Sequence, residues 1–341
     1  MKIPVINGAF RPQRVTGQQR YAQEIADRLV RDYGVEELRI TDSAGPLRAW
    51  LEAQMLGSRM SDPEAVLLTL TSRGPVRSRR QVVVVHDLFA LTNPEWFSRR
   101  YALTHGPVLR AQIASAAAVV TVSPMVAEQV GALAGSQKKI VVAPNAPADT
   151  FLQGGGEKSE LPKDLKGYRF MLCVGSMDPR KNLDLLVAAY AALAPEDRRE
   201  LRLALVGASS GNFSQVDIGA TGELEGLVRL GYVSDDELAA MYAHADAVLF
   251  PSLAEGFGLP IVEALAVGGR VIASDIPVFR WVGGDAVEYV DPRDPALWRG
   301  AMERVLAGSD GGGSRSCRQQ VGRAFSWDSS ASKVMELVTS L

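Results

Sequence analysis

The chain has 341 residues, of which 47% are hydrophobic and 22% charged, and its net charge at pH 7 is −2. This length predicts about two domains, and the composition is that of an ordinary soluble protein. No apolar run approaches the roughly 20 residues that a membrane-spanning helix needs, and the polar start at 1–8 argues against a signal peptide. The two cysteines, Cys173 and Cys317, favour a reduced, cytoplasmic setting over disulfides or a cysteine-based metal site.

Charge is unevenly distributed along the chain. Residues 1–150 contain 18 lysines and arginines against 13 acidic residues, whereas residues 151–341 contain 19 against 26. A basic surface aids solubility and attraction between domains, and it can also attract an anionic membrane or a phosphorylated acceptor. Nucleic-acid binding is not expected, because the net charge is negative and the basic residues are not interleaved with aromatic ones. The clustered basic residues of the first half are Arg73, Arg77, Arg79, Arg80, Arg99 and Arg100.

Short apolar runs rich in valine alternate with amphipathic stretches throughout the chain. Such runs are typical of parallel strands covered by helices on both faces, and the alternation predicts doubly wound α/β domains. Strands are predicted at 2–7, 65–70, 81–86, 118–122, 139–143, 169–174, 201–206, 246–250, 270–273 and 286–290. Helices are predicted at 19–33, 103–117, 124–133, 182–194, 235–244, 260–267 and 295–307.

A polar, glycine-rich stretch near 148–168, which contains the three glycines 154–156, predicts a linker between two domains. A second such stretch, 308–314, precedes the last helices. In doubly wound sheets, ligands bind beyond the carboxyl ends of the strands. Polar residues and glycines follow several of the predicted strands, so we expect the ligand at these edges, in a cleft between the two halves. These residues are Asn7, Gly8, His86, Asp87, Gly175, Ser176, Gly207 and 251–258.

Two cations stand immediately before a predicted helix. Arg180 and Lys181 precede Asn182, a candidate N-cap. Cations oppose the helix dipole at this end, where the dipole favours anions by about 0.3–1 kcal/mol. We therefore expect a compensating anion, and a diphosphate would satisfy both cations together with the free backbone amides. The alternative is a solvated surface pair beside Asp178 and Asp184.

A glycine loop between a predicted strand and a predicted helix carries two glutamates. Gly256 and Gly258 let backbone approach a ligand closely, and Pro260 suits the first helical turn. Glu263, one turn into the helix, can accept hydrogen bonds from a ribose diol, and Glu255 lies nearer the reacting sugar. The alternative for either glutamate is a solvated surface acid. The backbone amides expected to face an anion or sugar hydroxyls are those of Phe257, Gly258 and Leu259.

Taken together, these motifs resemble those of the retaining GT-B glycosyltransferases of family 4. The most specific match is 250–264, in which seven residues separate Glu255 from Glu263. The segment 85–88, followed by 93–97, is similar to the N-domain of bacterial mannosyltransferase-like members. One departure is Asn145-Ala146, where the family has Asn-Gly, so the form of the family's turn is not carried over to this position. Other matching segments are 174–182, 231–238 with Tyr242, 143–145 and 325–327.

The resemblance implies a GT-B fold of the α/β class, with two doubly wound Rossmann-like domains that face a cleft. The first domain, 1–150, would bind the acceptor and would include a C-terminal helix at about 326–341 that returns to it. The second domain, 165–325, would bind a nucleotide sugar.

The resemblance also implies site roles. Arg180 and Lys181 would hold the donor diphosphate and offset the charge of the leaving group. Glu255 would contact the donor sugar, His86 would lie near the donor sugar and the acceptor, and Glu263 would bind the ribose. No metal or cofactor is implied, because the two cations and a helix N-terminus supply the positive field. Further donor contacts are implied for Gly17, Gly175, Val233, Leu238, Phe257, Gly258 and Leu259.

The implied reaction transfers a hexose with retention of its anomeric configuration. Mannose from a guanine nucleotide is favoured, and the acceptor would be a hydroxyl of a glycan or of a polyprenyl-linked glycan. The basic first domain would allow peripheral contact with the inner face of a membrane. Three alternatives stay open. One is a dinucleotide oxidoreductase, although 207–211 matches its fingerprint poorly; the others are a sugar-nucleotide epimerase of GT-B architecture and a non-catalytic two-domain sugar-binding protein.

Overall fold

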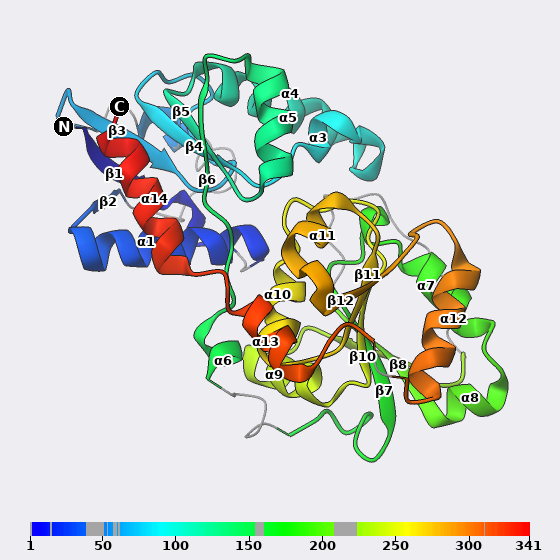
Figure 1. Ribbon diagram of the computed structural model, residues 1–341. Helices are drawn as coiled ribbons and strands as arrows, with labels where there is room; N and C mark the ends of the chain where they lie inside the picture. The colour runs from blue at the N-terminus through cyan, green and yellow to red at the C-terminus, as the bar shows by residue number, and fades with distance from the viewer. Residues whose placement is uncertain are drawn as a thin grey trace. The chain divides into compact units, whose positions relative to one another are not determined.

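The computed structural model describes residues 2–13, 16–38, 51–52, 54–56, 60, 62–153, 160–207, 224–309 and 311–341. The predicted linker glycines 154–156, residues 208–211 of the weak dinucleotide match and residue 310 lie outside these ranges. The chain divides into two compact units, and in each of them helices flank one parallel sheet (Figure 1). The first unit comprises Met1–Glu95, Arg99–Asn145 and Ser326–Leu341, and the second comprises Trp96–Ser98 and Ala146–Phe325.

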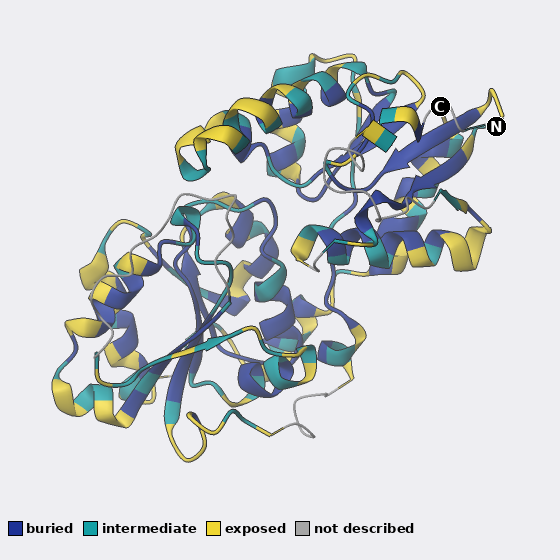
Figure 2. Cartoon of the chain, turned by 180° about the vertical axis from the view of Figure 1, so that it is seen from behind, coloured by how far each residue is buried: buried dark blue, intermediate teal, exposed yellow. Residues whose placement is uncertain are grey.

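The first unit is built on a six-stranded sheet in the order β2-β1-β3-β4-β5-β6, and all neighbouring strands are parallel. Strands β3, β4 and β5 are buried along their whole length, as their apolar runs predict (Figure 2). The strands are β1 (Ile3–Asn7), β2 (Glu36–Leu38), β3 (Ala65–Thr69), β4 (Gln81–Val85), β5 (Ala118–Thr121) and β6 (Lys139–Val142).

The C-terminal helix belongs to the first unit. This helix, α14 (Trp327–Thr339), packs against α1 (Gly17–Tyr33), and the red α14 lies beside the blue α1 in Figure 1. The expected return of the C-terminal helix to the N-domain is therefore confirmed. The remaining helices between β1 and β6 are η1 (Gly8–Phe10), α3 (Phe89–Thr92), η2 (Pro94–Trp96), α4 (Arg99–Ser115) and α5 (Pro124–Ala134).

The second unit contains a six-stranded parallel sheet in the order β12-β11-β10-β7-β8-β9. The chain builds outward from β7 through β8 and β9, then returns to the other side of β7 and builds outward from β10. The strand order therefore reverses between β7 and β10, which is the topological switch point of a Rossmann sheet. The strands are β7 (Arg169–Val174), β8 (Leu201–Val206), β9 (Leu227–Gly231), β10 (Ala247–Phe250), β11 (Val271–Ser274) and β12 (Val287–Val290).

The helices of the second unit cover both faces of this sheet. Trp298, which is fully buried, belongs to the core that packs α7 and α12 against β7, β8 and β10. In the described ranges, no helix of either unit is long and apolar enough to cross a membrane. The helices are α6 (Asp149–Leu152), η4 (Pro179–Lys181), α7 (Leu183–Ala191), α8 (Pro195–Glu200), α9 (Asp235–His244), α10 (Leu259–Ala266), α11 (Pro277–Gly283), η6 (Gly284–Ala286), α12 (Pro295–Leu306) and α13 (Arg315–Gly322).

The sequence analysis missed two strands, β2 and β9, and both are edge strands. β2 reads Glu-Glu-Leu, and β9 carries Arg229 at its centre, so neither shows the continuous apolar run that predicts a strand buried on both faces. It also missed the short helices α3, α6, α8 and α11, which are too brief to show a helical period. α4 begins at Arg99, four residues before its predicted start.

The loops after β7 and β8 approach each other at two glycines. Gly207 has φ +144°, and a Cβ at Gly207 would lie 1.7 Å from the carbonyl oxygen of Gly175. Two backbone hydrogen bonds hold the approach, from Gly175 to Val206 at 2.9 Å and from Gly207 to Gly231 at 2.8 Å.

We predict that Gly207→Ala lowers the free energy of unfolding by about 3 kcal/mol, because the methyl group must displace backbone. The matched control is Gly131→Ala inside α5, where Ile140, at 3.8 Å, is the one neighbour that a Cβ would meet within 4 Å among the described residues. The control should raise the free energy of unfolding by about 0.5–1 kcal/mol. Urea unfolding of both variants checks this, and equal midpoints would contradict it.

Candidate functional site

The loops that follow β7 and β10 meet at the switch point of the second sheet, where doubly wound folds bind ligands. The β7 loop contains η4 and leads into α7, and the β10 loop leads into α10. The backbone N–H of Leu253 in the β10 loop donates to the carbonyl oxygen of Arg180 in the β7 loop at 2.8 Å. Segments more than 70 residues apart in the chain are thereby joined into one surface.

Glu255 pairs with both cations of the β7 loop. The Lys181 ammonium donates to Glu255 Oε1 at 2.6 Å, and the Arg180 guanidinium donates to Glu255 Oε2. Ser252 Oγ also donates to Oε1, at 3.1 Å. The side chains of the three charged residues are only 11–14% exposed, so this is not the solvated surface pair of the alternative reading.

Asp178 completes this charged cluster. Its side chain is fully buried, and its Oδ2 accepts a hydrogen bond from Ser176 Oγ at 2.5 Å and lies 3.5 Å from the Arg180 guanidinium. Its Oδ1 is buried without a hydrogen-bond partner in the described ranges. We use "charged cluster" below for Asp178, Arg180, Lys181 and Glu255, whose formal charges sum to zero.

The charged cluster keeps Glu255 ionised. Burial alone would raise the pKa of the Glu255 carboxyl, but the charges of Arg180 and Lys181 and the hydrogen bonds outweigh burial and lower the pKa to about 2. Glu255 is therefore a carboxylate at neutral pH and cannot donate a proton there. The sequence analysis expected a bound diphosphate as the compensating anion, whereas in the protein alone this anion is the Glu255 carboxylate.

Asn182 does not cap the following helix with its side chain, which corrects the sequence-based expectation. The residue occupies the N-cap position of α7 in the left-handed conformation, with φ 55°. Its side-chain amide instead donates to the carbonyl oxygens of Pro251 at 3.1 Å and Pro292 at 2.8 Å. Asn182 thereby connects the loop after β7, which carries Arg180 and Lys181, to the loop after β10, which carries Glu255.

The glycine loop adopts the geometry that its sequence indicates. Gly258 is the N-cap of α10 with φ +105°, and a Cβ there would lie 2.9 Å from the Phe279 ring. The Phe257 ring is buried, and it packs edge to face against Trp281 at 5.9 Å and Phe325 at 5.2 Å between ring centroids. These contacts hold the backbone amides at the start of α10 in a fixed position.

The other predicted donor contacts lie at the same edge of the second sheet. Glu263, in the second turn of α10, is only 4% exposed. Gly175 follows β7, and a Cβ there would lie 3.0 Å from the Lys181 side chain. Val233 and Leu238 are half-buried around the start of α9, just after β9.

The two remaining predicted residues, Gly17 and His86, both belong to the first unit. His86 follows β4, and its ring packs edge to face against Tyr21 with ring centroids 5.1 Å apart. Gly17 opens α1 exactly one turn before Tyr21, so these two residues share a face of the helix. Among the residues that the structure describes, no atom lies within 4 Å of a Cβ placed at Gly17, so none of their contacts requires a glycine there.

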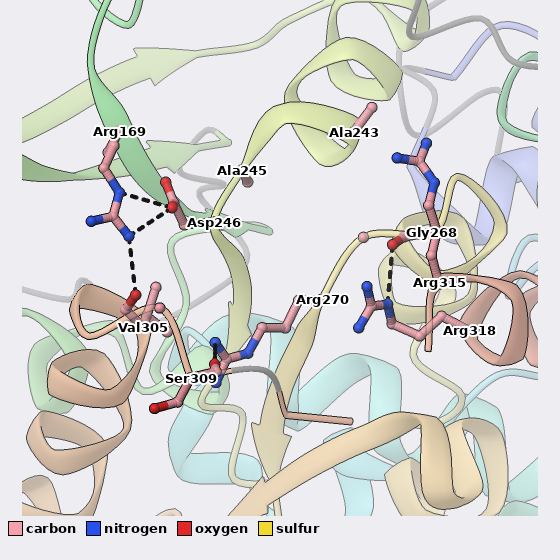
Figure 3. A pocket seen from close by; sticks show the side chains of 12 residues that line it. Arg169, Ala243, Ala245, Asp246, Gly268, Arg270, Val305, Ser309, Arg315 and Arg318 are labelled. Carbon is pink, nitrogen blue, oxygen red and sulfur yellow. Dashed lines mark hydrogen bonds and ion pairs between the residues drawn. The ribbon is translucent and has the colours of Figure 1, made fainter. Parts of the chain in front are cut away.

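A pocket of about 370 Å³ lies at the opposite edge of the second sheet, beside the starts of β7, β10 and β11 (Figure 3). Four arginines line it, but they donate to carbonyl oxygens at the ends of neighbouring helices. Arg169 donates to Val305 at 3.0 Å, and Arg318 donates to Gly268 at 3.1 Å. Such contacts satisfy the last carbonyls of helices and offset their dipoles. The lining contains none of the predicted site residues, so the charged cluster is the better candidate site.

The sequence analysis placed Ser176 and Ser252 at the ligand-binding edge but assigned neither a role, and the structure shows that they donate to the carboxylates of Asp178 and Glu255. Serine is common in loops, and only the fold shows that these hydroxyls face carboxylates. Their position directly after predicted strands was the one available signal.

Comparison with known proteins finds related sequences and similar folds. Residues 157–321 match the family described as Glycosyl transferases group 1. O-antigen chain mannosyltransferase B of Escherichia coli is 31% identical over 236 residues, which cover 64% of this chain and 59% of that protein. Sucrose-phosphate synthase from Thermosynechococcus elongatus has a similar fold, with a TM-score of 0.73 at 19% identity over 99% of both chains. HepE of Anabaena in complex with UDP-glucose has a TM-score of 0.71 at 16% identity, over 99% of this chain and 100% of that chain.

The second unit therefore carries a glycosyl transferases group 1 domain, and the chain as a whole has the GT-B fold. Both findings confirm the resemblance to glycosyltransferases of the GT-B fold. The alignment spans about three fifths of the length of the mannosyltransferase.

The low pKa of Glu255 predicts a pH-dependent contribution to stability. A carboxyl whose pKa is about 2 in the folded protein and about 4.3 in the unfolded chain stabilises the fold above pH 4.3. This contribution, about 3 kcal/mol at most, is lost as the pH falls towards 2. We predict that Glu255→Gln loses less stability than the wild type between pH 5 and pH 2.5.

Urea unfolding at several pH values checks this prediction. Glu128→Gln, which changes an exposed glutamate of α5, is the matched control and should follow the wild type. If Glu255→Gln also follows the wild type, the proposed charge coupling is wrong.

Proposed function

We propose that the protein is a retaining glycosyltransferase that moves a hexose from a nucleoside diphosphate sugar to an acceptor hydroxyl. The observation that carries this proposal is the charged cluster at the switch point, beside the N-terminus of α10. Two mostly buried cations and the first amides of a helix form a site for a diphosphate. The group 1 domain and the names of the matched relatives support the same reaction class.

The diphosphate of the donor would replace Glu255 as the ion-pair partner of Arg180 and Lys181. Glu255 occupies Arg180 and Lys181 in the protein alone, so a diphosphate that binds both cations must share or displace this carboxylate. The displaced carboxylate would then face the sugar attached to the diphosphate. We propose that Glu255 interacts there with the positive charge that develops on the sugar as the bond to the diphosphate breaks.

The remaining donor contacts follow from the positions around the cluster. The amides of Phe257, Gly258 and Leu259 would bind phosphate or sugar oxygens, with Gly175 leaving room beside the phosphate-binding lysine. Buried Glu263 would accept hydrogen bonds from the ribose. Val233 and Leu238 would frame the base.

In the reaction, the bond between the sugar C1 and the diphosphate oxygen breaks, and a bond forms from the acceptor oxygen to C1 on the same face. The acceptor proton passes to the leaving phosphate, which Arg180 and Lys181 stabilise as an anion. We propose that these two cations make a metal ion unnecessary. Transfer that is unchanged in EDTA would support this step, and restoration by Mg²⁺ after EDTA treatment would contradict it.

We propose mannose as the sugar and a lipid-linked or free glycan as the acceptor. The name of the E. coli mannosyltransferase supports mannose, whereas the HepE complex contains a uracil nucleotide, so the base needs a direct test.

Acceptor binding and peripheral membrane contact are proposed for the first unit. There Leu103, 69% exposed, follows the exposed Arg99 and Arg100 on α4 and could contact a lipid surface.

We predict that Lys181→Met abolishes both nucleotide binding and most transfer. A thermal-shift panel of GDP, UDP, ADP and TDP identifies the base, and donor hydrolysis with the best nucleotide measures turnover. Loss of one preorganised cation should reduce kcat by about 10²–10³-fold. Lys166→Met is the matched control, because Lys166 forms an exposed ion pair with Glu160 in the same unit. Near wild-type turnover in Lys181→Met would contradict the assignment.

We predict that Gly17→Ala separates activity from stability. The added methyl group meets no atom of the described residues within 4 Å, and alanine favours a helix over glycine, so the free energy of unfolding should rise by up to about 1 kcal/mol. If substrate approaches the backbone at this position, kcat/KM should nevertheless fall at least tenfold. Gly131→Ala should show the same stabilisation with unchanged kcat/KM. Full activity in Gly17→Ala would exclude close approach of a substrate there.

A further inference from the structure

His86 is held by a backbone carbonyl on one side of its ring. Its Nε2 lies 3.1 Å from the carbonyl oxygen of Leu70, the residue that follows β3. A carbonyl oxygen can only accept a hydrogen bond, so Nε2 must carry a proton. Nδ1 has no hydrogen-bond partner among the residues that the structure describes and is not among their buried unpartnered atoms. The ring therefore leaves Nδ1 open to a ligand.

Burial keeps the His86 ring uncharged at neutral pH. Burial lowers the pKa of His86 to about 4, although the hydrogen bond to Leu70 acts in the opposite direction. With Nε2 protonated and the ring neutral, Nδ1 carries a lone pair and is a hydrogen-bond acceptor. Tyr21 faces the ring, and burial raises its pKa, so this neighbour is also uncharged. Asp87 follows in the chain, and its Oδ1 accepts a hydrogen bond from the Phe89 N–H at 3.2 Å.

Tyr21 and Trp327 set the position of the His86 ring. Tyr21 is fully buried and meets the His86 ring at an interplanar angle of 88°. Trp327, the first residue of α14, supports Tyr21 from the C-terminal helix, with ring centroids 5.7 Å apart. The Tyr21 hydroxyl and Trp327 Nε1 are buried without hydrogen-bond partners in the described ranges, so these contacts are made by the rings.

We propose that Tyr21 and Trp327 are positioning residues that hold His86 with a proton on Nε2, so that Nδ1 accepts a hydrogen bond from a substrate hydroxyl. His86 then orients a sugar or acceptor hydroxyl and does not donate a proton to the leaving group. The substrate part of this inference rests on the proposed function, whereas the state of the ring can be measured in the free protein.

The direct test is ¹⁵N NMR of the histidine side chains in the protein without ligand. The chain has only three histidines, His86, His105 and His244, so single His→Gln substitutions assign every signal. We expect one signal set with a protonated Nε2 and a bare Nδ1 that does not titrate between pH 5 and pH 8. A protonated Nδ1, or titration near the ordinary value of about 6.5, would overturn the proposal whatever the protein catalyses.

Variants of Tyr21 test the positioning role. Tyr21→Phe keeps the ring and removes an unpartnered buried hydroxyl, so the His86 signals should stay unchanged. Tyr21→Leu removes the ring and admits water, and we expect the His86 pKa to rise and the second tautomer to appear. If Tyr21→Leu does not fold, Trp327→Leu tests the same support from the other side. Unchanged His86 signals in folded Tyr21→Leu or Trp327→Leu would exclude positioning by that ring.

Transfer kinetics add a separate readout. A protonated histidine has no acceptor, so in Tyr21→Leu kcat should fall at least tenfold as the pH decreases from about 8 to about 5. Wild type, Tyr21→Phe and the control His105→Gln should show no such inflection. If the NMR result holds but none of these proteins transfers a sugar, the proposed function fails and the ring assignment stands. If the NMR result holds but the Tyr21→Leu profile stays flat, the role as hydroxyl acceptor is wrong.

Discussion

The ion pairs of Glu255 with Arg180 and Lys181 are the constraint on which the candidate site depends. Removing these charges from water costs several kcal/mol per ion, and the cost is met only because every charge has a close partner. The same pairing joins the loops after β7 and β10 and places two cations beside the N-terminus of α10. A ligand that displaces Glu255 must bring its own negative charge, since Glu255 is the carboxylate that accepts hydrogen bonds from both Arg180 and Lys181.

The side chains at the carboxyl ends of the strands differ in charge between the two units. In the second unit the loops after β7 and β10 carry charged side chains and are joined by ion pairs and hydrogen bonds. This arrangement suits a diphosphate whose negative charge increases as it leaves. In the first unit the His86 ring is uncharged and packs against an aromatic ring, which suits a hydroxyl that needs orientation rather than charge. The arginine-lined pocket at the opposite edge of the second sheet shows that cations alone do not make a ligand site, because there they satisfy the ends of helices.

Much of the fold could be predicted, because strands buried on both faces must be continuously apolar. The central strands β3, β4, β5, β7 and β8 were all predicted from such runs. The edge strands β2 and β9 were not, because a strand with one paired side tolerates charged residues such as Arg229. The glycine loop was predictable for a similar reason: Gly258 occupies a conformation that other residues rarely adopt, so its position in the sequence carries structural information.

The sequence by itself determined the α/β class, the loop–helix units and the residue types of the site, since each depends on local pattern or spacing. Only the tertiary structure decided which of these residues meet. Glu255 follows Lys181 by 74 positions, and no local pattern indicates that its carboxylate neutralises that lysine. Nor could sequence show that Trp327, near the C-terminus, supports Tyr21 against His86, because such contacts arise from the packing of α14 on α1. Contacts between residues far apart in the sequence form only when the sheet is assembled. Such contacts keep Glu255 ionised through Arg180 and Lys181, and they place the Leu70 carbonyl oxygen beside His86 Nε2.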